Sequence, residues 1–160
     1  MTPAIDAFMT RRVQTIGLKS RLSEAHRLMN DNAIRHLPVL EGGRLVGMLS
    51  QRDLHLIETL KGVDPQEVNV EEAMTQDVYT VAPGTSLAEV ARTMAAHKYG
   101  SVLVVRGNEL EGIFTTIDAL QALETVLKAP ARKASAKKAS AKKAPSRRKA
   151  APARGRGRRS

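Results

Sequence analysis

The chain contains an internal repeat with an offset of 65 residues. Residues 9–53 lie over residues 74–118 without a gap, and 13 of the 45 aligned positions are identical. Each copy ends in glycine, two apolar residues, serine or threonine, two variable residues and aspartate, as Gly47–Asp53 and Gly112–Asp118. One copy of this length buries little surface by itself. The repeat therefore predicts two similar α/β units that share one core.

Apolar spacing and turn residues predict the same order of elements in both copies: strand, helix, strand, turn, strand, helix. The predicted helix N-caps are Ser20 and Ser50 in the first copy and Thr85 and Thr115 in the second. Ahead of them, residues 3–9 are expected to form one helical turn. The predicted strands cover residues 13–16, 37–40 and 45–49 in the first copy, and 78–81, 101–105 and 110–114 in the second.

The charge of the chain is strongly uneven. Residues 128–160 hold 14 Lys or Arg and no acidic residue, whereas residues 1–127 hold 12 basic and 16 acidic residues, a net of −4. No large apolar side chain follows Leu127, so the tail is expected to be disordered in isolation. Its composition favours sequence-independent association with DNA or RNA. Binding to an anionic membrane or an acidic protein, nuclear targeting in a eukaryote, and a merely solubilising run stay open as alternatives.

The residues expected to contact nucleic acid are basic side chains of the tail: Lys137, Lys138, Lys142, Lys143, Arg147, Arg148, Lys149, Arg154, Arg156, Arg158 and Arg159.

Composition argues against several classes of function. The absence of cysteine excludes disulfides and thiolate metal sites, and the four histidines share no metal-ligand spacing. No Gly-rich phosphate loop and no nucleophile with a neighbouring base are present, so we expect no enzyme activity. No run approaches 18 apolar residues. We therefore expect a soluble cytoplasmic protein that associates with the nucleoid through its tail.

The doubled motif resembles a tandem pair of cystathionine-β-synthase-type (CBS) domains, a Bateman module. Supporting features are Val13-Gln14-Thr15, Val78-Tyr79-Thr80 and Arg35-His36-Leu37-Pro38-Val39. The resemblance implies two β-α-β-β-α units, residues 5–62 and 68–127, packed sheet to sheet as a pseudo-twofold α/β (α+β) module. The basic tail, residues 128–160, lies outside it and resembles the Lys/Ala-rich tails of linker histones.

The resemblance also implies regulatory binding of an adenosine-containing ligand, such as AMP, ADP, ATP or S-adenosylmethionine, in the cleft between the units. Homodimerisation through the helices is implied as well, and no catalytic cofactor is. Carried over to this sequence, the ligand-binding positions are Ser20, Ile34, Arg35, His36, Ser50, Asp53, Thr85, Tyr99, Gly100, Ser101, Thr115 and Asp118.

A simpler interpretation competes with this one. Ser/Thr-x-x-Asp at a helix start is also a capping box, which needs no ligand. Arg35 and His36 give the first unit cationic donors that Gly100 and Ser101 do not provide, so we expect one strong and one weak site, without knowing which. The alternative function is a structural nucleoid-associated protein, whose folded body only dimerises and makes the tail bivalent.

Overall fold

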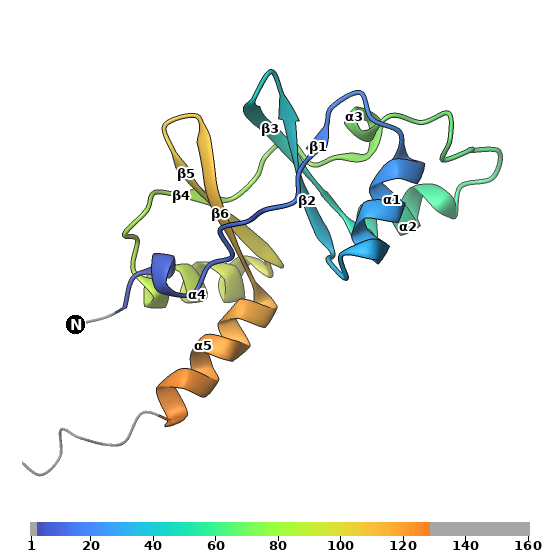
Figure 1. Cartoon of the computed structure of the whole chain (residues 1–160). Coiled ribbons are helices and arrows are strands. Elements are labelled where there is room, and N and C mark those ends of the chain that lie inside the picture. The colour runs from blue at the N-terminus through green and yellow to red at the C-terminus, as the bar shows by residue number, and fades with distance from the viewer. Residues whose placement is uncertain (1–2, 129–160) are drawn as a thin grey trace, which may run out of the picture. The chain divides into compact units, whose positions relative to one another are not determined.

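The computed structural model describes residues 3–128, which form two three-stranded sheets with helices packed on them (Figure 1). The sheets have the orders β1-β2-β3 and β4-β5-β6. In each sheet the first two strands are parallel and the last two form an antiparallel hairpin. The predicted α/β class, with two repeated units packed together, is confirmed.

The two repeats contain equivalent elements. The first contains β1 (Ile16–Gly17), α1 (Leu22–Asp31), β2 (His36–Glu41), β3 (Arg44–Ser50) and α2 (Gln51–Glu58). The second contains β4 (Thr80–Val81), α4 (Leu87–His97), β5 (Ser101–Arg106), β6 (Glu109–Thr115) and α5 (Thr116–Lys128). A short leader element precedes each repeat, the 3-10 turn η1 (Ile5–Ala7) or the helix α3 (Val70–Ala73).

The 65-residue offset extends to backbone detail. The bounds of β2 and β3 become those of β5 and β6, and the register shift after Val39 recurs after Val104. Ala33 and Lys98, which precede the middle strands, both adopt positive φ, at 51° and 58°. This conformation is uncommon for residues with a Cβ. The repeat therefore reproduces an unusual backbone turn at the entry to each middle strand.

The predicted hairpin turns and two of the four predicted caps are confirmed. Ser50 accepts a hydrogen bond from the Asp53 amide at 3.2 Å, and Thr115 accepts one from the Asp118 amide at 3.5 Å. The predicted first strands were placed too early, because β1 and β4 begin at Ile16 and Thr80 and contain two residues each.

The caps predicted at Ser20 and Thr85 are wrong. The N-cap positions are Arg21 and Ser86, and neither side chain makes a capping hydrogen bond within the described residues. The Thr85 hydroxyl instead donates to the carbonyl of Ala82 at 2.7 Å.

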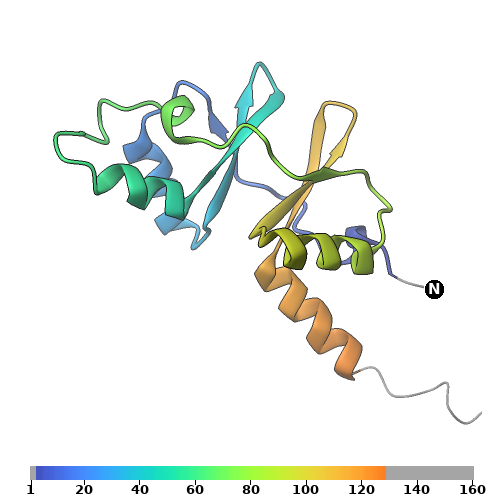
Figure 2. The same ribbon diagram turned by 180° about the vertical axis from the view of Figure 1, so that it is seen from behind.

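The leader of each repeat packs on the opposite repeat. The amide of Ile5 donates to the Thr85 carbonyl at 2.9 Å, and the amide of Val70 donates to the Ser20 carbonyl at 2.8 Å. Figure 2 shows this exchange, with the N-terminal leader beside α4 and α3 beside α1. The fully buried Ile5 and Val70 enter the second and the first core, respectively. The unit boundaries 5–62 and 68–127 thus stay a prediction, because the leader at the start of each unit packs in the core of the other.

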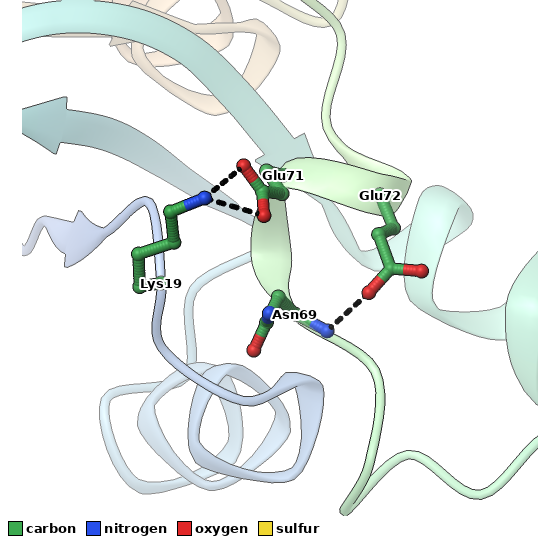
Figure 3. Close-up of polar contacts among 4 residues, drawn as sticks. All are labelled: Lys19, Asn69, Glu71 and Glu72. Atoms are coloured by element: carbon green, nitrogen blue, oxygen red, sulfur yellow. Dashed lines mark hydrogen bonds and ion pairs between the residues drawn. The ribbon is translucent and has the colours of Figure 1, made fainter.

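Polar contacts fix the second leader at its start (Figure 3). Lys19, just after β1, donates to both carboxylate oxygens of Glu71 at 2.7 and 2.6 Å. The Asn69 amide donates to the Glu72 carboxylate at 3.0 Å, which satisfies one of the free amides at this helix start. An exposed ion pair contributes little stability, so these contacts add modestly to the buried Val70 and the backbone hydrogen bonds that hold α3.

A third apolar cluster joins the two sheets. Met48 of β3, Leu103 of β5 and Ile113 of β6 are buried together between the repeats. Two isolated β-bridges frame this cluster, Met48 with Thr75 and Thr10 with Ile113. They are equivalent under the 65-residue offset, so the pseudo-twofold relation holds where the repeats meet.

The motif glycines allow close approach of the leaders. A Cβ on Gly47 would lie 2.6 Å from Sδ of Met74 and 2.8 Å from the backbone oxygen of Thr75. A Cβ on Gly112 would lie 2.6 Å from Sδ of Met9, and the three nearest atoms all belong to that side chain. A methionine side chain can move to another rotamer, whereas the backbone oxygen is held by the Met48–Thr75 bridge.

Gly47→Ala is expected to lower the free energy of unfolding by about 1–3 kcal/mol, the usual cost of overpacking a core. Gly112→Ala is the matched control and is expected to cost less, because only Met9 has to move. Chemical denaturation of both variants checks the order. An equal or larger loss in Gly112→Ala would contradict this account of the packing.

Candidate functional site

Two clefts lie between the repeats, and each is built from both. The Asp53 cleft, about 470 Å³, lies between residues 50–53 and residues 77–79 and 98–101. The Asp118 cleft, about 620 Å³, lies between residues 115–118 and residues 12–14 and 33–36. The wall positions of the two clefts correspond under the 65-residue offset. Both are large enough for a nucleotide-sized ligand.

Each cleft contains a carboxylate at the start of a helix. One oxygen of Asp53, Oδ2, accepts hydrogen bonds from the Ser50 amide at 2.8 Å and the Ser50 hydroxyl at 2.6 Å. Oδ2 of Asp118 accepts from the amide and hydroxyl of Thr115 at 2.7 and 2.8 Å. Among the described residues, no group donates a hydrogen bond to either Oδ1 atom. The capping box is therefore formed, and each carboxylate keeps one oxygen for a ligand.

Ten of the twelve predicted ligand positions line the clefts. Arg35, His36 and Gly100 line both. The Asp53 cleft adds Ser50, Asp53, Tyr99 and Ser101, and the Asp118 cleft adds Ile34, Thr115 and Asp118. Arg35 and His36, which the sequence assigns to the first unit, also line the Asp118 cleft, because the strand-entry segments extend to the opposite aspartate.

Ser20 and Thr85, which were predicted as ligand-binding positions, line neither cleft. Their carbonyls bind the leaders, as described above. Ala25 and Val90, in the helices that follow them, are fully buried in the cores of the two repeats. Residues 20 and 85 thus serve the exchange of leaders, whereas residues 77–79 and 12–14 line the clefts.

Sequence reasoning missed several cleft residues that differ between the copies. Asp77 and Tyr79 line the Asp53 cleft, whereas the equivalent Arg12 and Gln14 line the Asp118 cleft. The rings of Tyr79 and Tyr99 stack with their centroids 5.4 Å apart, and His97 stacks on Tyr99 at 5.2 Å. The aligned repeats did contain a signal for this difference. Arg12 and Gln14 follow Thr10, whereas the chemically different Asp77 and Tyr79 follow the matched Thr75.

His36 forms part of the wall shared by the clefts. A Cβ on Gly100 would lie 3.1 Å from its Nε2 atom, so the absence of a side chain at residue 100 leaves room for the imidazole. Burial lowers the pKa of His36, with a further decrease from Arg35, although Asp53 opposes the shift. The imidazole is therefore neutral near pH 7 and presents one donor and one acceptor nitrogen.

The lowered pKa of His36 predicts a loss of stability in acid. Between the ordinary histidine pKa, about 6.5, and the lower folded value, the unfolded chain binds a proton that the folded chain does not. The free energy of unfolding should therefore fall as pH drops below about 6.5. His36→Gln is expected to flatten this slope in denaturation curves measured from pH 7.5 to 5. An unchanged slope in the variant would contradict the lowered pKa.

The predicted nucleic-acid contacts, from Lys137 to Arg159, all lie outside the described residues. Within residues 3–128, no helix is both long and apolar enough to cross a membrane.

Comparisons with known proteins agree with the fold. A family model described as CBS domain matches residues 5–56 and 70–125. The CBS domain-containing protein YhcV of Bacillus subtilis is 35% identical over 105 residues, which cover 66% of this chain and 74% of that protein.

Solved structures agree as well. A Vibrio cholerae protein provisionally named acetoin utilization protein (AcuB) superposes with a TM-score of 0.73 at 33% identity, covering 79% of this chain and 94% of that one. The CBS domain pair of protein MJ0100, solved with 5′-methylthioadenosine and S-adenosyl-L-methionine, gives a TM-score of 0.72 at 22% identity, covering 79% and 99%.

Proposed function

The chain belongs to the CBS-domain family, and on this premise we propose that it is a regulatory module that binds an adenosine-containing ligand in the clefts between its repeats. The observation that carries the proposal is the pair of aspartates with one unused carboxylate oxygen, each in a cleft to which the other repeat contributes at least one cationic side chain. CBS domains are regulatory modules, and we propose no enzyme activity for this chain.

The chemistry of each cleft suits a ribose with an attached charged group. A carboxylate accepts hydrogen bonds from ribose hydroxyls, as acidic residues do in other nucleotide-binding folds. The helix start beside it offers amide donors and the positive end of a helix dipole. Arg35 reaches both clefts and is suited to a phosphate or carboxylate group. Occupancy of one cleft should therefore affect the affinity of the other through this shared side chain.

Thermal unfolding of the full chain with AMP, ADP, ATP and S-adenosylmethionine tests this proposal. A ligand that binds only the folded state adds about 2.7 kcal/mol at a hundred times its dissociation constant. For a folded part of this size the midpoint should rise by several degrees. No rise with any of the four compounds would favour the alternative, a dimerising scaffold for the basic tail.

Helix α5 is the proposed connection between ligand and tail. Its first turn contributes Thr116, Ile117 and Asp118 to the Asp118 cleft, and its last residue, Lys128, immediately precedes residues 129–160. Ala122 is its only buried residue, so α5 is weakly held along its length. A ligand at Asp118 would change the position of α5, and through it the presentation of the tail.

We further propose that the chain forms a homodimer through α5. An apolar groove of about 290 Å³ opens between α4 and α5, lined by Leu87, Ala91, Leu123 and Val126 among others. Leu87 is only partly buried, whereas the matching residue of the first repeat, Leu22, is fully buried. Ile117, Leu120 and Leu127 leave α5 with further exposed apolar surface. An exposed apolar face of this kind is typical of an interface, and a second copy presents a matching one.

Leu120→Glu is expected to convert the dimer to a monomer, because it places a charge on the exposed apolar surface of α5 that the proposed interface would cover. Gln121→Glu adds the same charge at the neighbouring polar position and serves as the matched control. Sedimentation equilibrium of the wild type and both variants measures the effect. A monomeric wild type, or a dimer that both variants retain, would contradict the proposed interface.

The tail is proposed to associate with DNA or RNA without sequence preference, with 14 basic and no acidic residues in 128–160. A dimer would carry two tails, which raises avidity without new contacts. Cytoplasmic, nucleoid-associated localisation is proposed on the same ground.

A further inference from the structure

The two clefts differ chemically at positions that the repeat makes equivalent. Five pairs of lining residues, separated by 65 in sequence, change their character between the Asp118 and the Asp53 cleft. These pairs are Arg12 and Asp77, Gln14 and Tyr79, Ala33 and Lys98, Ile34 and Tyr99, and Ile117 and Arg52.

The Asp118 cleft contains only one acidic residue. Arg12 and Arg35 are its cations, and Asp118 is held at the helix start by Thr115. The other positions at which it differs from the Asp53 cleft carry an amide or an apolar side chain: Gln14, Ala33, Ile34 and Ile117. Two guanidinium groups without a second acid suit a phosphate, because guanidinium binds phosphate oxygens through paired hydrogen bonds.

The Asp53 cleft contains a second acid, Asp77, beside three cations, Arg35, Arg52 and Lys98. Asp77 stands where the other cleft has Arg12, so it repels a phosphate there and attracts a cation. The stacked rings of Tyr79 and Tyr99 add electron-rich faces, which also attract cations. Arg52 and Lys98 can pair with a carboxylate. A ligand with both a positive centre and a carboxylate fits this combination better than a phosphate does.

We infer that the two clefts divide the ligand classes: the Asp118 cleft takes an adenosine phosphate, and the Asp53 cleft takes an adenosine that carries a sulfonium and an amino-acid group. S-adenosylmethionine is the representative of the second class. This inference rests on the proposed binding of adenosine ligands. The chain would then sense two different metabolite signals at once, with Arg35 common to both clefts.

The two tyrosines provide a specific readout. The chain has two tyrosines and no tryptophan, and both tyrosines line the Asp53 cleft. S-adenosylmethionine should therefore change the intrinsic tyrosine fluorescence of the full chain, whereas AMP should release heat in a calorimetric titration with a much smaller fluorescence change. Each ligand should bind with a stoichiometry of one per chain.

Charge reversal at the two exposed positions separates the sites. Arg12→Asp is expected to weaken AMP binding at least about tenfold and to leave S-adenosylmethionine binding unchanged. Asp77→Arg is expected to weaken S-adenosylmethionine binding by a similar factor and to add a second AMP site. Arg12→Gln and Asp77→Asn should give smaller effects in the same directions, and they keep the test valid if a reversed charge disturbs folding.

The outcomes distinguish this inference from the proposed function. If both ligands respond to the same variant, or if AMP changes tyrosine fluorescence as strongly as S-adenosylmethionine does, the division is overturned while adenosine binding stands. If neither compound binds the wild type, the division is overturned, and the proposed function is overturned with it only when ADP and ATP fail to bind as well.

Discussion

Removal of residues 129–160 is expected to weaken binding to duplex DNA at low salt by at least about a hundredfold, because the tail displaces counterions from the phosphate backbone. Residues 1–128 that remain hold 13 basic residues, the 12 of residues 1–127 plus Lys128, against 16 acidic ones. Their net charge of −3 repels DNA. The loss should therefore be nearly complete, and not a partial weakening.

Salt dependence identifies the mechanism. For the full chain, the logarithm of the association constant should fall steeply with the logarithm of salt concentration, by about 0.9 for each phosphate contact. A chain with its tail residues in scrambled order is the matched control and should bind equally well, since no base readout is expected. Fluorescence anisotropy with a labelled duplex measures both. Tight binding by the truncated chain, or a loss of binding on scrambling, would contradict a sequence-independent tail.

The double replacement Asp53→Asn and Asp118→Asn is expected to weaken adenosine-ligand binding by about ten- to a hundredfold. An amide has one acceptor oxygen, and the helix cap already uses one oxygen of each carboxylate. The variant thus has no second acceptor for the ribose hydroxyls. Calorimetric titration of the folded variant with each ligand measures the loss.

A cap-only variant separates ligand contact from helix capping. Ser50→Ala with Thr115→Ala removes the hydroxyls that pair with the two aspartates and keeps both carboxylates. We expect a small loss of stability, about 1 kcal/mol per cap, and a smaller loss of ligand affinity than in the aspartate variant. Equal losses of affinity in the two variants would show that the aspartates act through the cap alone.

The hairpins and the second helix of each repeat were predictable because their signals are local. Gly42 and Gly107 adopt the positive φ that a tight turn needs, and Ser50 and Thr115 cap the helices that follow. The first helices were less well predicted, because serine or threonine near a helix start also favours turns. Neither Ser20 nor Thr85 is a cap in the structure.

The arrangement of the clefts depended on contacts that no local pattern specifies. Each leader crosses to the opposite repeat, and only in the folded chain do residues 12–14 face Asp118 and residues 77–79 face Asp53. The contact between the two tyrosines is likewise not specified by any local sequence pattern. Tyr79 and Tyr99 are 20 residues apart and stack only because β4 lies beside β5. Sequence reasoning found the aspartates and Tyr99 and missed Tyr79, Arg12 and Asp77.

Isothermal titration calorimetry of the full chain with AMP, ADP, ATP and S-adenosylmethionine tests adenosine binding, the central claim, most directly. We predict saturable binding of at least one of the four, with no more than two sites per chain, one in each cleft. The Asp53→Asn and Asp118→Asn variant should weaken this binding by about ten- to a hundredfold. No saturable heat from any of the four compounds at millimolar concentration would contradict the account and leave a dimerising scaffold as the function of the folded body.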